Sequence, residues 1–553
     1  MKRLKTPWHI SFTRAVSLLL VLSTLFLLTA CGRRRDNDNE LMESTGGRDL
    51  VKATMADNVF SLNSNPNFSR NPFVATNHSN QLVCDLLYEN MVEVDEDFHV
   101  IPNVIGSWTA NDSFTIWTFV LDQEHEHTFS DGDPVTGRDL VYSIGFAIYN
   151  DRFRGRFASY QGASYTDDGM QVTLGIGDSQ FPKLLNIPVI KLGTFEVEAG
   201  VPPIGSGPYR YDEEMVKLEV NPYYEDYKSL PLKNIYLQEY TDAEGTLEAF
   251  EDGIIDLAVN DPSSYTSLGY ASSNEIHSFA TTNMHYIMFN EESTFGRSAA
   301  FRIAMQYAFD RDYLVELLGG NAVASPIPLY PTLEFYPQSL ADSIGYNLDV
   351  CKAVLESAGI ADLDGDGRME YTGAGAQSRF EIVLMVCADS SAKAGIANRF
   401  KESMKSIGIN VNVQELGWDE YLQALQDGYF EAGNREVTWD MYYGEVKLRN
   451  NFDLTELLQV RDEKNPGGNL NYSRSRDTTI VDRINNYLRA SEAARPIVYN
   501  ELCEYLTRTS GNLVTIGFEK QQIIAHRGVI KGMEPNIGNP LYGFKDWTID
   551  MDD

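Results

Sequence analysis

Hydrophobic positions between about residues 290 and 450 alternate between helical spacing and strand spacing. Apolar residues three and four apart predict helices, and short apolar runs bounded by glycine predict strands. The predicted helices cover residues 298–309, 347–358, 392–407 and 418–426, and the predicted strands cover residues 380–386 and 409–415. Asp310 is expected to cap one further helix, which ends at Gly319 and Gly320. The alternation predicts an α/β lobe whose strands are at least partly parallel.

The earlier part of the chain predicts further elements. Residues 77–91 place their apolar side chains on one helical face. Residues 114–121 are apolar on both sides of a predicted strand, so this strand is expected to be covered on both faces. Thr136 and Asp139 have the spacing of a capping box, which predicts that a helix begins there.

The chain is too long for a single hydrophobic core. It has 553 residues, whereas one core stops growing at roughly 250 to 300 residues, so at least two domains are expected. The net charge of -34 repels phosphate backbones, and no basic stripe offsets this charge. Nucleic acid is therefore not expected as a partner.

The N-terminal segment has the layout of an export signal. Lys2, Arg3, Lys5 and Arg14 precede an apolar run over residues 15–28. This run is shorter than the roughly 20 apolar residues that span a bilayer. Leu28-Thr29-Ala30-Cys31 resembles the bacterial lipobox, in which the thiol of the cysteine is acylated. Residues 1–31 are predicted to be a lipoprotein signal peptide with its lipobox, and the polar residues 32–49 are predicted to be a flexible tether. The alternative is an ordinary cleaved signal with an incidental cysteine.

Acylation of Cys31 would anchor the protein to the cell membrane at its extracytoplasmic face. The other cysteines are Cys84, Cys351, Cys387 and Cys503. Their spacing shows neither a CxxC pair nor a disulfide framework. They are therefore expected to be small buried apolar residues.

Two segments have the composition of metal sites. His125 and His127 are two positions apart at a strand end, so both imidazoles would point to one face. No third ligand is near them in the sequence, which favours an exposed strand end over a metal site and gives no support to nickel as cargo.

The second segment resembles the first half of a calcium loop. Asp362, Asp364 and Asp366 alternate about a glycine turn, and Glu370 follows. The closing glutamate of a calcium loop is replaced by Gly373. A structural Ca²⁺ site and a solvated acidic turn both remain open, and no other cofactor is expected.

Motifs of the common enzyme classes are absent from the sequence. It contains no G-x-S-x-G elbow, P-loop, HExxH helix or dinucleotide-binding glycine pattern. No catalytic residue is predicted, and the chain is not expected to be an enzyme.

Short motifs occur in a fixed order along the chain. They are Asn71-Pro72-Phe73, residues 129–134 with 139–143, Gly205-Ser206-Gly207-Pro208-Tyr209, Asn221-Pro222-Tyr223-Tyr224, residues 248–257 and residues 301–311. Together they resemble the extracellular solute-binding proteins of family 5, the oligopeptide, dipeptide and nickel group, which are receptors of ABC importers. This resemblance implies the two-lobed periplasmic-binding-protein fold of type II, cluster C, with an extra inserted domain.

The family's architecture implies three regions in this chain. Lobe I would comprise residues 50–82, 200–284 and 510–553. The extra domain would comprise residues 83–199, and lobe II would comprise residues 285–509. Two lobes joined by a few crossing segments imply a hinge around a ligand cleft.

The resemblance also implies which residues contact the ligand. In lobe II these are Trp418, Trp439, Tyr442, Tyr443, Gly444 and Glu445, and in lobe I they are Thr76, Asn77 and His78. Where many relatives have an Asp-rich run, this chain reads Glu445-Val446-Lys447-Leu448-Arg449, so Glu445 is the best candidate to bind a peptide amine. Arg435, Lys447 and Arg449 are candidates to bind a ligand carboxylate.

The resulting expectation is a monomeric lipoprotein that binds a peptide and delivers it to an ABC permease in the membrane. A surface sensor or adhesion lipoprotein of the same fold is the second possibility, and a surface hydrolase is the third. Sugars and opines remain alternative cargoes, because a fold does not fix its ligand.

Overall fold

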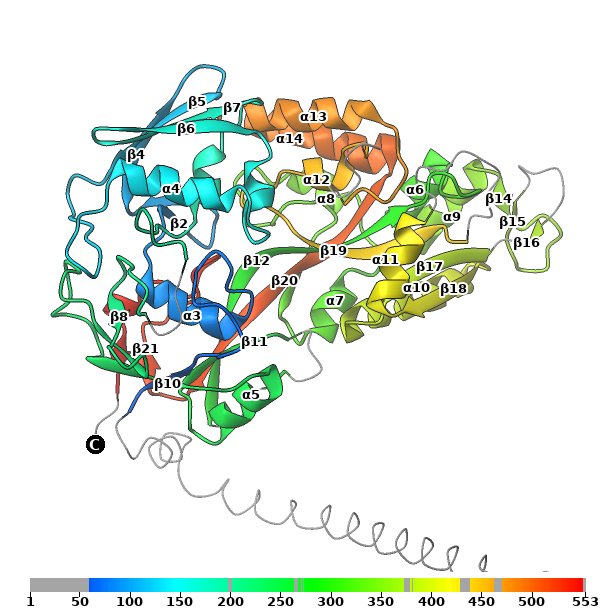
Figure 1. The fold of residues 1–553 in the computed structure, drawn as a ribbon. Helices are drawn as coiled ribbons and strands as arrows, with labels where there is room; N and C mark the ends of the chain where they lie inside the picture. Colours follow the sequence, from blue (N-terminus) through cyan, green and yellow to red (C-terminus); the bar gives the residue numbers. More distant parts are fainter. Residues whose placement is uncertain are drawn as a thin grey trace, which may run out of the picture.

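The structure is a computed structural model that describes residues 59–196, 201–262, 267–269, 271, 273–371, 378–379, 381–427, 438–461 and 470–550. The signal segment 1–31 with Cys31, the tether 32–49 and Arg435 lie outside these ranges. Lobe II occupies the right of Figure 1, and the extra domain lies at the left above lobe I. The expected mixed α/β architecture is confirmed.

One mixed seven-stranded sheet extends through both lobes in the strand order β11-β20-β12-β19-β17-β18, and β13 pairs with β20. Strands β17, β18 and β19 are parallel, whereas β12 runs antiparallel to β19 and β20. The strands are β11 (Leu257–Asn260), β12 (Asn274–Phe289), β13 (Ala322–Ala324), β17 (Glu381–Cys387), β18 (Asn410–Leu416), β19 (Met441–Lys447) and β20 (Leu513–His526).

Helices cover the lobe II half of this sheet on both faces. Successive residues of β12 point to opposite faces, so Tyr286 and Met288 enter one hydrophobic core and Ile287 and Phe289 enter another. The helices are α6 (Ala299–Met305), α7 (Asp312–Leu317), α8 (Gln338–Asp342), α9 (Leu348–Ser357), α10 (Ser391–Ser406), α11 (Trp418–Gln426), α12 (Thr455–Leu458), α13 (Thr478–Arg489) and α14 (Arg495–Glu504), followed by the π-helix η4 (Tyr505–Ser510). A small sheet of β14 (Ile360–Ala361), β15 (Glu370–Tyr371) and β16 (Ser378–Arg379) lies at the far end.

The predicted elements agree with these helices and strands, except that the helix predicted over 298–309 ends at Met305 and the predicted cap at Asp310 is absent. Ser298 caps α6 by accepting a hydrogen bond from the backbone of Phe301, as the pattern predicts. The prediction that Asp310 caps the next helix is wrong, because Arg311 holds the N-cap position of α7 without a side-chain cap. The Asp310 carboxylate instead accepts hydrogen bonds from Arg399 on α10.

Lobe I is built on a four-stranded sheet, to which helices and a short hairpin are added. The strand order is β1-β10-β9-β8, with β1 and β10 parallel. The elements are β1 (Ser61–Asn63), α3 (His78–Leu87), β8 (Tyr209–Tyr211), β9 (Lys217–Val220), β10 (Asn234–Gln238), α5 (Ala243–Glu251), β21 (Ile530–Lys531), η5 (Phe544–Asp546) and β22 (Thr548–Ile549).

The extra domain carries an antiparallel sheet in the order β4-β5-β7-β6, and the predicted capping box is present at the start of α4. Its elements are β2 (Val92–Val94), β3 (Val100–Pro102), β4 (Ile105–Ala110), β5 (Ile116–Leu121), α4 (Gly137–Ala147), η1 (Arg154–Phe157), β6 (Tyr160–Thr166), β7 (Gly169–Leu174) and η2 (Phe181–Leu185).

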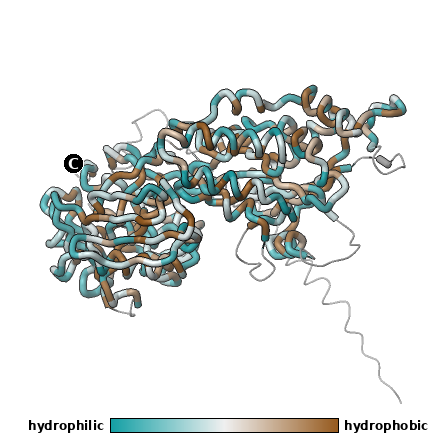
Figure 2. Tube along the Cα trace, turned by 90° about the horizontal axis from the view of Figure 1, so that it is seen from above, coloured by the Kyte–Doolittle hydropathy of each residue, from teal (hydrophilic) through white to brown (hydrophobic). Residues whose placement is uncertain are grey.

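The extra domain and most of lobe I share one continuous hydrophobic core, so these two regions pack as one body. Figure 2 shows two bodies side by side, with hydrophobic and hydrophilic positions alternating along the chain in both.

Two long strands, β12 and β20, connect these bodies. Their register shifts between Ala280 and Met284 and again between His285 and Tyr286. The pairing of β12 with β19 begins at Asn283, within the first irregularity. The ladder is thus interrupted near residue 284, where the sequence predicts a crossing between the lobes, and the hinge itself stays a prediction.

Two residues of the extra domain, Val94 and Phe98, are buried in the core of lobe II. Phe98 lies at the tip of the β2–β3 hairpin, where its φ of 64° is left-handed. Its fully buried ring lies 4.9 Å from the ring of Phe452 and 5.5 Å from that of Tyr330. The hairpin therefore joins the two bodies by an aromatic contact as well as by the hinge strands.

Cys84, Cys351, Cys387 and Cys503 are free and buried, which confirms that they act as small apolar residues. Among the described residues, no helix combines the length and the apolar character needed to cross a bilayer.

Candidate functional site

A cavity of about 920 Å³ lies where lobe I and the extra domain meet lobe II. The wall from lobe I and the extra domain includes Tyr88 at the end of α3 and the segment that follows α4. The opposite wall is the end of β19 and the residues that follow it. Segments about 300 residues apart in the sequence thus form one site. The volume falls within the roughly 300 to 1,000 Å³ typical of small-molecule sites.

Three basic side chains that line this cavity, Arg152, Arg156 and Lys447, form no ion pair with a carboxylate of the described residues. Arg152 donates a hydrogen bond to the carbonyl of Pro72, and Arg156 donates one to the carbonyl of Asn186, at 2.6 and 2.5 Å. Lys447, the last residue of β19, lines the cavity from the other side. Within the described part of the chain, none of the three basic groups forms an ion pair. Carbonyl oxygens orient the guanidinium groups but do not neutralise them.

The pKa values of the three groups reflect their crowding. Burial, with the neighbouring charge of Arg152, lowers the pKa of Arg156 to about 9. Burial, followed by the charges of Arg156 and Arg152, lowers the pKa of Lys447 to about 8. With these pKa values Arg156 and most of Lys447 remain charged at neutral pH, and an arginine guanidinium does not lose its proton in proteins, so the cavity holds a concentrated positive charge.

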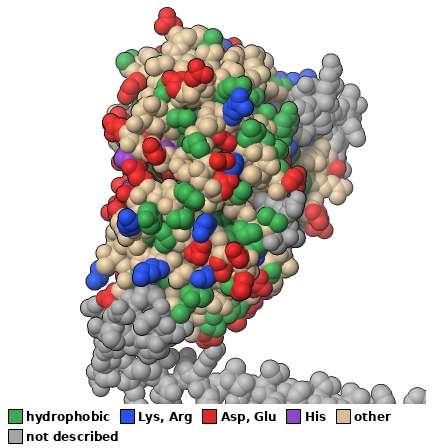
Figure 3. All heavy atoms as spheres, turned by 60° about the vertical axis from the view of Figure 1, so that its left-hand side comes forward, with side chains coloured by type: hydrophobic (Ala, Val, Ile, Leu, Met, Phe, Trp, Pro, Cys, Tyr) green, Lys and Arg blue, Asp and Glu red, His purple; other side chains and the backbone are tan. Residues whose placement is uncertain are grey.

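The other basic side chains of the cavity are paired with carboxylates. Arg154 lies 3.1 Å from Asp151, and Arg449 contacts Asp453 and lies 3.8 Å from Glu456. Figure 3 shows acidic, basic and hydrophobic side chains interspersed over one face of the molecule, so the unpaired positive cluster differs from the outer surface seen there.

Asp85 of α3 also lines the cavity, but it supplies little negative charge. Burial raises the pKa of this carboxyl group to about 8, although the nearby Arg152 opposes the shift. At neutral pH most of the Asp85 carboxyl is protonated and can donate a hydrogen bond. The cavity therefore suits an anionic ligand.

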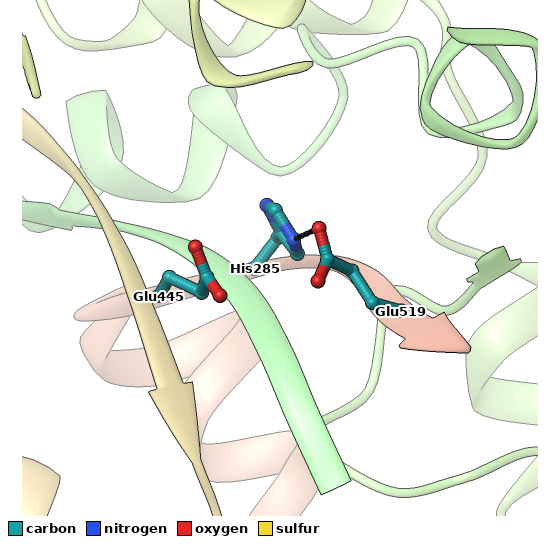
Figure 4. A group of neighbouring side chains, drawn as sticks. All are labelled: His285, Glu445 and Glu519. Atoms are coloured by element: carbon teal, nitrogen blue, oxygen red, sulfur yellow. Dashed lines mark ion pairs between the residues drawn. The ribbon is translucent and has the colours of Figure 1, made fainter. Parts of the chain in front are cut away.

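Glu445, the predicted amine-binding residue, lies on β19 within a polar network (Figure 4). Its carboxylate lies 2.8 Å from the ammonium group of Lys393 and accepts a hydrogen bond from Asn283. Burial alone would raise the pKa of Glu445, but His285, Lys393 and Asn283 together lower it. A ligand amine would have to compete with Lys393 for this carboxylate.

His285 forms the centre of the same network. Its Nε2 lies 2.9 Å from Glu519, and its Nδ1 lies 3.0 Å from the hydroxyl of Tyr443. The donor atoms of His285, Glu445 and Glu519 are close enough for one metal ion. The fit is poor, because Lys393 would place a second cation against the metal.

The other predicted ligand residues lie around this network. Trp439, Tyr442 and Tyr443 are buried in the two cores of lobe II, and Gly444 packs directly against the ring of Tyr286. Trp418 begins α11 and is 59% exposed. None of these residues lines the 920 Å³ cavity.

In lobe I, Asn77 caps α3 by accepting a hydrogen bond from the backbone of Asn80, and Thr76 precedes it on the surface. Burial lowers the pKa of His78, and the charge of Lys447 is the next largest cause. The role of these residues in binding stays a prediction.

Sequence reasoning named Lys447 but missed Arg152 and Arg156. The available signal was the run Arg152-Phe153-Arg154-Gly155-Arg156, which is unusually basic for a chain with a net charge of -34. Only the fold shows that its first and last arginines meet Lys447 while the middle one pairs with Asp151.

The paired histidines do not form a metal site with each other. His125 contacts Glu225, and His127 contacts Glu89, each at 3.0 Å. Each imidazole thus contacts its own carboxylate. His125 is largely exposed, which agrees with the prediction of an exposed strand end.

The acidic loop brings together Asp362, Asp364 and Glu370, whose oxygens lie within 4.8 Å of one another. Asp366 instead accepts a hydrogen bond from the backbone of Arg368. Asp362 and Glu370 accept hydrogen bonds from backbone amides, which also suit a plain acidic turn.

If the loop binds Ca²⁺, millimolar Ca²⁺ should raise the melting temperature relative to EDTA, because a ligand of the native state adds about 2.7 kcal/mol at 100 times its Kd. Differential scanning calorimetry measures the shift. The variant Asp364→Asn should abolish it, whereas Asp366→Asn should not. Equal melting temperatures of the wild type in both buffers would establish the plain acidic turn.

Comparisons with known proteins support the two-lobed fold. The oligopeptide-binding protein AppA of Bacillus subtilis is 23% identical over 489 residues, which cover 83% of this chain and 85% of AppA. The periplasmic murein peptide-binding protein MppA of Escherichia coli is 22% identical over 392 residues, covering 64% and 69% of the two chains. The crystal structure of the substrate-binding protein CtaP of Listeria monocytogenes superposes with a TM-score of 0.68 at 17% identity and covers 89% of this chain and 98% of CtaP.

The family model "Bacterial extracellular solute-binding proteins, family 5 Middle" matches residues 99–455, which is more than half of the chain. The matched segment contains the arginine run and the residues of the network around Glu445 other than Glu519. It also contains the cavity wall formed by the end of β19. The chain therefore belongs to family 5 of the bacterial extracellular solute-binding proteins, which bind solutes for transport and are not enzymes.

Proposed function

We propose that this protein captures a peptide in the cavity between its two bodies and delivers it to the membrane subunits of an ABC importer. The observation that carries this proposal is the 920 Å³ cavity, whose walls come from both sides of the hinge. A ligand that contacts both walls stabilises the closed arrangement, because it binds that state more tightly than the open one.

The names of relatives favour a peptide but leave a second candidate. AppA is named as an oligopeptide-binding protein, and its crystal structure holds a nonapeptide. Other structures of the same fold hold Ni(L-His) in NikZ and agropinic acid in AgaA. A non-peptide solute that carries carboxylates is therefore the alternative cargo, and the basic cavity is the observation that favours it.

Mass spectrometry of the small molecules that co-purify with the protein tests the proposal. Peptides should be released on denaturation and should bind again to the emptied protein by calorimetry. Recovery of a sugar or another non-peptide solute would replace the peptide assignment. A protein that neither retains nor rebinds any solute would favour a sensor or adhesion role instead.

We also propose that Cys31 is acylated and anchors the protein at the extracytoplasmic face of the membrane. Two or more acyl chains contribute roughly 0.8 kcal/mol per buried CH₂ group, which holds a folded domain firmly at a bilayer. Cys31→Ser should move the protein from the membrane fraction to the soluble fraction or leave its signal uncleaved. Cell fractionation and intact-mass measurement check this outcome, with Cys84→Ser as the control that stays membrane-bound. A wild-type protein that is unlipidated and freely secreted would contradict it.

A further inference from the structure

We infer that Arg152, Arg156 and Lys447 form a subsite for the dicarboxylate end of the captured solute, such as an acidic residue at the C terminus of a peptide. This inference rests on the proposed function and specifies the class of ligand. The other candidate clusters already hold their own partners, as Glu445 does with Lys393. In the cavity, by contrast, Arg152 and Arg156 contact backbone carbonyls and the ring of Phe153, and neither forms an ion pair with a carboxylate of the described residues.

The geometry of the subsite favours a bridging anion. Arg152 and Arg156 project from the segment after α4, on the side of the extra domain, whereas Lys447 comes from β19 of lobe II. The anion would thus contact both bodies at once. Each guanidinium group is fixed by a backbone carbonyl and keeps further N–H donors for a carboxylate. Binding energy from such an anion therefore favours lobe closure directly.

The charge balance favours two carboxylates over one. Three positive groups face a cavity in which Arg154 and Arg449 are already paired with Asp151 and Asp453. Asp85 offers no full negative charge at neutral pH, because its burial favours the protonated form. A single carboxylate would leave most of this repulsion in place, whereas a dicarboxylate offsets most of it.

Unpaired positive groups in one cavity destabilise the empty protein, since like charges repel. Groups that cost stability in this way are typical of binding sites, where the ligand supplies the missing charge. A structural role for Lys447 would predict the opposite, namely that its removal destabilises the protein.

Calorimetry with defined probes tests the subsite. The wild type should bind Ala-Ala-Glu at least tenfold more tightly than Ala-Ala-Gln, and it should bind glutarate, a free dicarboxylate. Lys447→Met and Arg152→Met should each weaken binding of Ala-Ala-Glu about thirty-fold or more, as expected when one partner of a desolvated charge pair is removed. Arg154→Met is the matched control, since Arg154 lines the same cavity but pairs with Asp151. It should retain nearly full affinity.

The melting temperature of the empty protein gives a second readout. Lys447→Met should leave it unchanged or raise it, because the substitution relieves repulsion. A clear fall in the melting temperature, with unchanged affinity for Ala-Ala-Glu, would overturn the inference.

Other outcomes separate this inference from the proposed function. Equal affinity of the wild type for Ala-Ala-Glu and Ala-Ala-Gln overturns the subsite but leaves peptide capture intact. If neither tripeptide binds, the binding of glutarate tests the subsite on its own. Binding of glutarate that is lost in Lys447→Met supports the subsite while peptide capture fails, and absence of glutarate binding overturns the subsite. Tighter binding of inorganic phosphate than of glutarate overturns the carboxylate assignment.

Discussion

Replacing Phe98 by alanine should lower the free energy of unfolding by about 3 to 5 kcal/mol, the range for deleting a fully buried phenylalanine ring. The ring fills a position between Phe452 and Tyr330 in the core of lobe II, so its removal leaves a cavity lined by aromatic side chains. Alanine keeps a Cβ at the left-handed backbone position, so the backbone cost is unchanged and the loss reports the ring alone.

Urea denaturation monitored by circular dichroism measures this loss. The control is Phe68→Ala, because Phe68 is 43% exposed and its removal should change the free energy by less than about 0.5 kcal/mol. A loss below about 1 kcal/mol for Phe98→Ala would show that the hairpin leaves the core of lobe II in solution.

The second large effect is a dependence of stability on pH. The free energy of unfolding should fall as pH rises from 5 to 8. Burial raises the pKa of Glu93 and of Asp178 to about 7 each. Only 7% of Glu93 and 6% of Asp178 are exposed, so solvent screens these groups little. Both carboxyls retain their protons in the folded chain at pH values where the unfolded chain has lost them.

The sign follows from this difference in protonation. The stabilising contribution is fully present below the ordinary carboxyl pKa of about 4 and is lost as pH rises through about 7. Within that window each group lowers the free energy of unfolding by about 1.4 kcal/mol per pH unit. Asp178 also accepts a hydrogen bond from Asn451 of lobe II, so its ionisation affects the contact between the two bodies.

Denaturation at several pH values, compared between variants, isolates the two groups. Glu93→Gln and Asp178→Asn should each reduce the slope of the unfolding free energy against pH by about 1.4 kcal/mol per pH unit, the value for one proton. Substitution of an exposed carboxylate, Glu124→Gln, should leave this slope unchanged. Parallel curves for the wild type and both variants would mean that these carboxyls ionise normally in the folded protein.

The sequence pattern predicted several helices and strands of lobe II between residues 298 and 426, because these have a clear apolar face and a cap or a glycine at the end, but it did not predict α8, α12, α13 or α14. The pattern of residues 392–407, for example, corresponds to α10 (Ser391–Ser406) within one residue at each end. The prediction of a cap at Asp310 was wrong, because Arg399 from α10 donates a hydrogen bond to that carboxylate. Local patterns carry no information about such a competing partner.

The site was harder to predict for the same reason. Tyr442 and Tyr443 have the alternation of a strand covered on both faces, and this pattern does not distinguish the wall of a cleft from a core. Phe98 is a single aromatic residue between acidic residues and a histidine, which resembles an exposed turn. The basic cavity exists only because the fold brings residues 152–156 close to Lys447, and nothing in the spacing of these residues along the chain indicates that proximity.

The buried thiols make this protein a convenient subject for fluorescence measurements. Because Cys84, Cys351, Cys387 and Cys503 are inaccessible, maleimide dyes should react only with cysteines introduced on the surface of the folded protein once Cys31 is blocked by its lipid or replaced. Tyr149 in the extra domain and Ile497 in lobe II are both largely exposed and lie on opposite bodies. A donor and an acceptor dye at these two positions would report lobe movement in single molecules without removal of any native thiol from the folded domain.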